Sequence, residues 1–111
     1  MSDKKLLSAE DIFAANDTEI ATVDVPEWGG AVRVRTMTAL EADEFGDTEK
    51  KDALVRLVEI CAIDADGGRL FQKEHLEKLR GKNWNVILRI HQAAAKLNGL
   101  TTEGQAAAKN G

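Results

Sequence analysis

The segment Asp64-Ala65-Asp66-Gly67 has the residue types with which a calcium-binding loop begins. Two carboxylates one residue apart, followed by a glycine that permits a sharp turn, supply the first oxygen ligands of an EF-hand. That pattern also needs a further oxygen ligand and a glutamate at its twelfth position, where His75 stands instead. Because aspartate and glycine are also the usual residues of polar turns, the segment predicts a turn and not a calcium site.

The chain has one cysteine, Cys61, and two histidines, His75 and His91. A zinc site needs four protein ligands, or three and a water molecule, and these residues include no closely spaced pair. Cys61 lies in an apolar run, where burial raises the pKa of a thiol and opposes nucleophilic reactivity. We therefore expect Cys61 in the core, His75 on a helix surface and His91 at the edge of the core.

Other catalytic patterns are not found either. The two serines, Ser2 and Ser8, both lie near the first residue, and no arrangement of serine, histidine and aspartate suggests itself. The pairs Gly29-Gly30 and Gly67-Gly68 fit neither common phosphate-loop pattern. The sequence therefore predicts a protein that is not an enzyme, with no catalytic, cofactor-binding or metal-binding residue.

The candidate functional residues are instead ones that contact proteins. Trp28 either packs across its loop onto a helix or anchors a partner, because tryptophan is common in both settings. Arg33 and Arg35 alternate with valines, so they form either a solvated sheet face or a surface that pairs with an acidic partner. We predict Trp28, Arg33 and Arg35 as protein-contact residues.

A β-hairpin must position these three side chains. Apolar residues alternate with polar ones over residues 19–25 and again over 31–36, which predicts two strands. Pro26 cannot donate a ladder hydrogen bond and so marks a strand end or an edge, while Trp28-Gly29-Gly30 forms the turn and places Trp28 at the hairpin tip. Two strands alone are only marginally stable, so helices are expected to cover their apolar face.

Caps and apolar spacing predict the helices. The expected helices run from about Ser8 to Ala15, Thr38 to Gly46, Asp47 or Thr48 to Ala62, Lys73 to Leu79, and Trp84 to Leu97. The helix before Ala62 is expected to be central because apolar residues recur at helical spacing, namely Leu54, Leu57, Val58 and Cys61. The predicted fold class is α+β, with an N-terminal β-hairpin packed against a mainly helical body of about four helices.

Length and composition limit the alternatives. The 111 residues suggest one domain, expected over residues 1–100, followed by a weakly helical or disordered tail over 101–111. With 15 basic and 19 acidic residues the net charge is −4, which argues against nucleic-acid binding. No apolar run approaches the roughly 20 residues of a membrane span, and the beginning is too briefly apolar for a signal peptide. We therefore expect no membrane partner and a cytoplasmic location.

Several short segments occur in a familiar order. They are Leu7-Ser8-Ala9-Glu10-Asp11-Ile12-Phe13-Ala14-Ala15, Val23-Asp24-Val25-Pro26-Glu27-Trp28-Gly29-Gly30, Val32-Arg33-Val34-Arg35, Asp64-Ala65-Asp66-Gly67, Arg69-Leu70-Phe71 and Leu97-Asn98-Gly99-Leu100. In combination and spacing they resemble the small tail assembly chaperones of long-tailed bacteriophages and prophages. The resemblance extends from about Leu7 to Leu100 and includes no catalytic signature.

This resemblance implies a function. Such chaperones bind the aggregation-prone tape-measure protein, keep it soluble, help recruit tail-tube subunits, and are absent from the finished virion. It also implies a mainly helical α+β domain that self-associates, in the cytoplasm of a bacterial host. Many members are also made in a longer form by a programmed ribosomal frameshift, and the Ala108-Lys109-Asn110 run is compatible with a slippery codon sequence. The alternatives are a structural phage connector or tail-completion component, or a generic protein-interaction adaptor.

Overall fold

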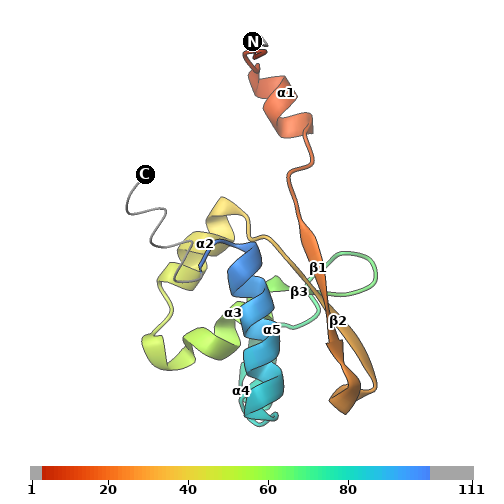
Figure 1. Cartoon of the computed structure of the whole chain (residues 1–111). Helices are drawn as coiled ribbons and strands as arrows, with labels where there is room; N and C mark the ends of the chain where they lie inside the picture. Colours follow the sequence, from red (N-terminus) through yellow and green to blue (C-terminus); the bar gives the residue numbers. More distant parts are fainter. Residues whose placement is uncertain (1–3, 101–111) are drawn as a thin grey trace.

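A three-stranded antiparallel sheet forms one side of the molecule (Figure 1). The computed structural model describes residues 4–100, so the predicted tail over 101–111 lies outside the described residues. Strands β1 (Ile20–Val25) and β2 (Gly30–Arg35) pair along their whole length, with Val23 opposite Val32. The alternation of apolar and polar residues thus produces the predicted hairpin.

The hairpin turns through a short 3₁₀ helix, η1 (Pro26–Trp28). The proline ring presets the backbone angle at the first position of this turn. Gly29 then adopts a left-handed conformation with φ of 80°, which a residue without a β-carbon reaches at little cost. Trp28 is consequently held at the hairpin tip, as the sequence predicted.

The third strand, β3 (Ala62–Ile63), pairs antiparallel with β2 and was not predicted. Ala62 was expected to end a helix, but it instead lies opposite Val34 and its carbonyl accepts a hydrogen bond from the Leu70 backbone. A short apolar run has the same appearance in a helix and in a buried strand. The partners that select the strand lie far away in sequence.

Helices cover the sheet. Their bounds are α2 (Ala39–Gly46), η2 (Lys50–Asp52), α3 (Ala53–Cys61), η3 (Lys73–His75), α4 (Leu76–Arg80) and α5 (Trp84–Leu97). Helices α3 and α5 pack against each other at the centre of the body, and α5 also contacts β1 and β2 (Figure 1). Together with the sheet they confirm the predicted α+β class with a helical body.

Helix α3 is central, as its apolar spacing predicted. Leu57, Val58, Ile60 and Cys61 are completely buried, and Leu54 packs against them. The helix begins at Ala53, however, and neither Asp47 nor Thr48 caps it. Both residues belong to the end of α2, because the Asp47 backbone donates to the Asp43 carbonyl and the Thr48 hydroxyl donates to the Glu44 carbonyl.

Side-chain caps set the ends of other helices. Thr38 and Glu41 form a reciprocal capping box at the start of α2, and Asn83 accepts hydrogen bonds from the first turn of α5. At the other end of α5, Gly99 adopts φ of 71° and the Leu100 backbone donates to the Ala95 carbonyl. This pattern is a Schellman motif and confirms the predicted stop.

Helix α1 (Ala9–Ala14) stands away from this body (Figure 1). Ser8 and Asp11 form a second capping box, yet no residue of α1 is buried. The described residues measure 51 × 34 × 25 Å along the principal axes. Among them no helix combines the length and the apolar character that crossing a membrane requires.

Candidate protein-binding groove

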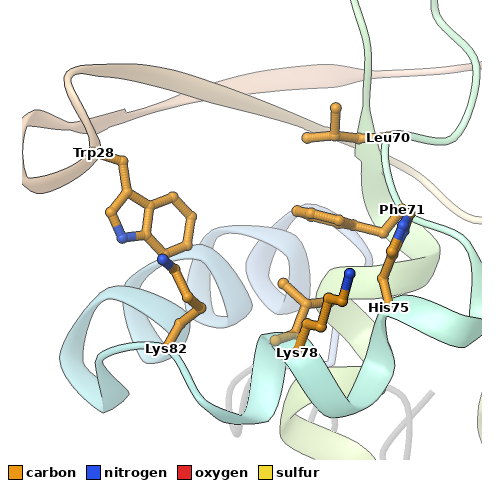
Figure 2. A pocket seen from close by; sticks show the side chains of 7 residues that line it. Trp28, Leu70, Phe71, His75, Lys78 and Lys82 are labelled. Atoms are coloured by element: carbon orange, nitrogen blue, oxygen red, sulfur yellow. The ribbon is translucent and has the colours of Figure 1, made fainter.

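An apolar groove of about 480 Å³ lies between the hairpin tip and helix α4 (Figure 2). Its walls carry the two aromatic rings of Trp28 and Phe71, and Figure 2 shows them approaching from opposite sides. Leu79, which is almost completely buried, forms the base. The lining residues are Trp28, Leu70, Phe71, His75, Lys78, Leu79 and Lys82.

Three parts of the chain bring these side chains together. Trp28 comes from η1, Leu70 and Phe71 follow the turn after β3, and the remaining lining residues belong to η3, α4 and the residues directly after α4. The turn itself is built by Asp64, whose carboxylate accepts hydrogen bonds from the backbones of Asp66 and Gly68. The Asp-Ala-Asp-Gly segment thus uses its carboxylate to close a turn, as its composition predicted.

An ion pair fixes the hairpin tip that carries Trp28. Arg89 of α5 donates two hydrogen bonds to the Glu27 carboxylate, at 2.9 and 2.7 Å, and a third to the Asp24 carbonyl. The hydrogen bonds from the Arg89 guanidinium lower the pKa of Glu27 to about 2. Trp28 therefore sits on a turn that is tied to helix α5.

Trp28 has the packing role that its sequence position allowed, and part of its ring also lines the groove. It is partly buried and packs against the core, which is the interpretation of a tryptophan folded onto a helix. The Nζ atom of Lys82 lies 5.5 Å from the centre of its ring, a cation–π contact. The remaining ring surface lines the groove, where it is available to a partner.

His75 holds the opposite wall in place. Its Nδ1 atom accepts a hydrogen bond from the Gln72 backbone at 2.9 Å. Its ring meets that of Phe71 edge to face, with centroids 6.3 Å apart. The imidazole therefore orients Phe71 and completes the cap of η3, and so lies beside the groove and not on the open helix surface that was predicted.

Lysines give the groove a cationic edge. Lys78 and Lys82 are both exposed and flank the apolar walls. An apolar side chain of a partner can enter between the rings, while a neighbouring carboxylate meets these ammonium groups. The arrangement therefore suits an amphipathic segment that carries a large apolar residue beside an acidic one.

The two predicted arginines lie apart from the groove. The Arg33 guanidinium donates to the Asp64 carbonyl at 2.7 Å. Arg35 donates two hydrogen bonds to the Glu41 carboxylate, at 2.7 and 2.8 Å, and its side chain is largely buried. The expectation of a solvated sheet face is therefore wrong, because α2 and the turn after β3 cover this face. The acidic group that pairs with Arg35 belongs to the chain itself.

Arg35 belongs to a larger cluster of charges beneath α2. Glu59 on α3 is completely buried and pairs with Arg56 and with Arg69, the latter at 3.1 Å. Arg69 also reaches Glu41 at 2.9 Å. Hydrogen bonds from Arg35 are the largest cause that lowers the pKa of Glu41, to about 2. The cluster joins β2, α2, α3 and the turn after β3.

The cysteine and the second histidine considered as candidate reactive residues both lie in or beside the core. Cys61 is completely buried, and burial raises the pKa of its thiol to about 11. His91 lies at the core edge, with Nδ1 3.2 Å from the Leu54 carbonyl oxygen, and burial lowers its pKa. Within residues 4–100, no three histidine, cysteine, aspartate or glutamate side chains gather in a way that could hold a metal ion.

Sequence reasoning found Trp28 but missed the opposite wall of the groove. Phe71, His75, Lys78 and Lys82 recur at spacings of three and four residues in the sequence, but only His75 and Lys78 lie within η3 and α4. Lys78 and Lys82 were unremarkable as isolated surface lysines. These lysines line the groove only because the fold places Trp28 opposite them.

The described residues form a small α+β fold with an open apolar groove on its surface. A solved structure titled as that of the bacteriophage HK97 tail assembly chaperone has a similar fold, with a TM-score of 0.61. The alignment covers 79% of this chain and 90% of that chain, at 24% sequence identity. The chain therefore has the fold of a tail assembly chaperone, which confirms the resemblance at the level of fold. No family model matches the sequence, and no curated protein matches it.

Proposed function

We propose that this protein is a phage tail assembly chaperone that binds the tape-measure protein and keeps it soluble during tail morphogenesis. The likeness in fold to the HK97 chaperone is the observation that carries the proposal. The groove between Trp28 and Phe71 supports it, because a chaperone without a catalytic site must recognise its client through exposed apolar surface. The protein acts as a binding partner and not as an enzyme.

Trp28 is the contact residue that the groove favours. Arg33 and Arg35 stay predictions as contact residues, although both guanidinium groups bond within the chain. An Arg33→Ala variant separates the two roles for that residue. Because the variant also loses the bond to Asp64, binding is compared well below its melting temperature; if Arg33 contacts the client, the folded variant binds less tape-measure protein.

Further steps of the proposed function concern other tail proteins. We propose that the chaperone helps recruit tail-tube subunits through a longer, frameshifted form, and that it leaves before the virion is complete. The codons for Ala108-Lys109-Asn110 test the first part, because a frameshift at this point needs a slippery run of adenines. Codons without such a run would exclude a frameshift at this point.

Co-expression with the tape-measure protein encoded next to this gene tests the central claim. We expect the chaperone to raise the soluble fraction of the tape-measure protein and to co-purify with it. Trp28→Ala and Lys82→Glu should both reduce co-purification. Trp84→Ala is the matched control, because Trp84 is exposed but lies outside the groove lining.

Circular dichroism melting of each variant keeps the test interpretable. Trp28 packs on the core, so its loss can lower stability, whereas Lys82 is exposed and its replacement should leave the melting temperature unchanged. If Lys82→Glu and Trp84→Ala retain equal amounts of tape-measure protein, the groove is not the client surface. If the wild-type chain does not increase the soluble fraction of the tape-measure protein, the proposal that this 111-residue chain is its chaperone is wrong.

A structural connector or tail-completion component is the second candidate. It rests on the same fold, and no separate observation in residues 4–100 favours it. Mass spectrometry of purified virions distinguishes the two, because a structural component persists in particles. Detection at one or more copies per virion would contradict the chaperone role.

A further inference from the structure

Strand β1 forms an edge of the sheet. The strand order is β1-β2-β3, so within residues 4–100 β1 pairs with a neighbouring strand on one side only. In an antiparallel ladder, every second residue directs its backbone N–H and C=O groups toward the neighbour, and the residues between them direct theirs away. The Thr36 backbone donates to the Glu19 carbonyl at 3.0 Å, which sets this alternation. The backbone groups of Ile20, Thr22 and Asp24 therefore point outward.

A contact from helix α5 agrees with this direction. Arg89 donates a 3.2 Å hydrogen bond to the Asp24 carbonyl, which therefore faces away from β2. This bond occupies the end of the edge near the hairpin tip. At the other end, which leads to α1 (Figure 1), no hydrogen bond within residues 4–100 reaches the outward groups of Ile20 or Thr22. Their N–H and C=O groups are left to solvent.

A second apolar groove, of about 410 Å³, lies between this end of β1 and helix α5. Ala21 lines it from the strand, and Ala93 and Leu97 line it from the helix. Side chains on neighbouring strands share the faces of a sheet. A strand added beside β1 would therefore place every second side chain over this groove, next to Ala21.

The opposite face of the edge is apolar as well. Ile20 is 52% exposed there, because the side chains of a strand alternate between faces. Proteins usually protect an edge strand with a lysine, a proline or a bulge. Strand β1 contains neither lysine nor proline, and Pro26 comes only after its last residue. Both faces of the edge can therefore pack against an added strand.

The charges beside this edge indicate which strand fits it. Glu19 and Asp24 are exposed, and neither forms an ion pair within residues 4–100. Two β1 strands placed side by side would bring two carboxylates from each copy together, so a second β1 is a poor partner. A strand that carries a basic residue beside its apolar ones complements the edge. The cationic Trp28–Phe71 groove has the opposite preference.

We propose that the outer edge of β1 binds an extended segment of an unfolded partner protein. The segment adds as a further strand beside Ile20–Thr22, and its backbone pairs with the outward N–H and C=O groups. Its apolar side chains enter the groove against α5, and a lysine or arginine at its end meets Glu19 or Asp24. This site lies apart from the Trp28–Phe71 groove and does not depend on the identity of the client.

Isothermal titration calorimetry with a synthetic peptide, Lys-Val-Thr-Val-Thr-Val-Lys, tests the edge without any tape-measure protein. The control peptide carries methyl groups on two adjacent central backbone nitrogens, which removes a donor from each edge of the peptide strand. We expect the methylated peptide to bind at least about tenfold more weakly, because backbone hydrogen bonds are lost. Equal binding of the two peptides, or no binding of either, overturns the proposal. Tighter binding of a peptide with glutamates in place of both lysines also overturns it.

Two neighbouring positions on α5 provide matched variants. Ala93→Arg places a long side chain over the groove and should weaken binding of the peptide by about tenfold, because apolar contact is lost. Gln92→Arg adds the same charge at an exposed position outside the groove lining and should bind the peptide as the wild type does. Circular dichroism melting shows that both variants are folded. Equal binding by the two folded variants overturns the proposal.

Amide hydrogen exchange followed by NMR locates the added strand. In the free chain we expect the Thr22 amide to exchange fast and the Val23 amide slowly, because only Val23 directs its N–H toward β2. Saturating peptide should slow exchange at Ile20 and Thr22 and leave Val23 as the reference. Unchanged exchange at Thr22 overturns the proposal. Protection of Thr22 that rises with protein concentration in the absence of peptide would identify a second copy as the occupant and also overturn it.

Discussion

Replacing Glu59 with glutamine tests whether the buried charge cluster holds the fold together. Glu59 is completely buried on the central helix, and its carboxylate pairs with Arg56 and Arg69. Glutamine keeps the shape of the side chain and removes only its charge. The variant therefore measures the electrostatic contribution with no new cavity.

The expected loss follows from what each arginine keeps. Breaking a buried ion pair costs about 3–5 kcal/mol, because the remaining charge stays buried without compensation. Arg69 keeps Glu41 at 2.9 Å, and Arg56 keeps only a long contact of 3.9 Å to Glu44. Because both arginines keep another carboxylate partner, we expect a loss at the lower end of this range. Glu59→Gln should decrease the unfolding free energy by about 3 kcal/mol.

Urea denaturation followed by circular dichroism measures this change. A loss of about 3 kcal/mol would lower the melting temperature of a domain of this size by more than about 10 °C. Glu49→Gln is the matched control, because its pair with Lys51 is exposed and should contribute less than about 1 kcal/mol. Equal stability of Glu59→Gln and Glu49→Gln would refute the view that the cluster joins the sheet to the helices.

Three further predictions concern other parts of the body. Hydrogen bonding to Arg35 depresses the pKa of Glu41 to about 2, so the ionised carboxylate stabilises the fold above the unfolded pKa of about 4.5. As the pH falls toward 2, up to about 3 kcal/mol of the unfolding free energy should be lost, which urea titrations at several pH values measure. Glu41→Gln should remove this contribution of Glu41 to the pH dependence. Asn98→Ala should cost about 1–3 kcal/mol in the same assay, because the Asn98 side chain accepts a 2.7 Å hydrogen bond from the partly buried Met37 backbone. Cys61 should react with a thiol reagent at the rate of global unfolding and react at once in urea, and fast labelling of the native protein would contradict its burial.

Local signals explain which elements were predicted correctly. A helix cap involves residues within three or four positions, so Ser8, Thr38 and Asn83 mark the starts of their helices in the sequence itself. The same holds for the turn glycines at the hairpin tip and after α5. Strand β3 could not be found in this way, because its two residues pair with β2, about thirty positions earlier.

Buried charge is harder to predict than buried hydrocarbon. Glu59 stands between Val58 and Ile60, and a helical apolar stripe leaves such a position to solvent by default. The sequence did not indicate that Arg56 and Arg69 pair with Glu59. Charged residues are almost never fully buried unless they are paired, so without known partners they are assigned to the surface. Arg33 and Arg35 were assigned to a solvated face for the same reason. Only the positions of α2 and of the turn after β3 show that this face is covered.

Those buried pairs also clarify how an acidic protein can offer a cationic groove. The net charge of −4 would discourage an acidic partner if it were spread evenly over the surface. Glu41 and Glu59, however, are neutralised inside the body by arginines, while Lys78 and Lys82 remain exposed beside Trp28. Because salt screens exposed charges over about 8–10 Å, a partner at the groove meets mainly these nearby lysines. Binding of an acidic, apolar segment should therefore weaken as salt concentration rises, despite the negative net charge of the chain.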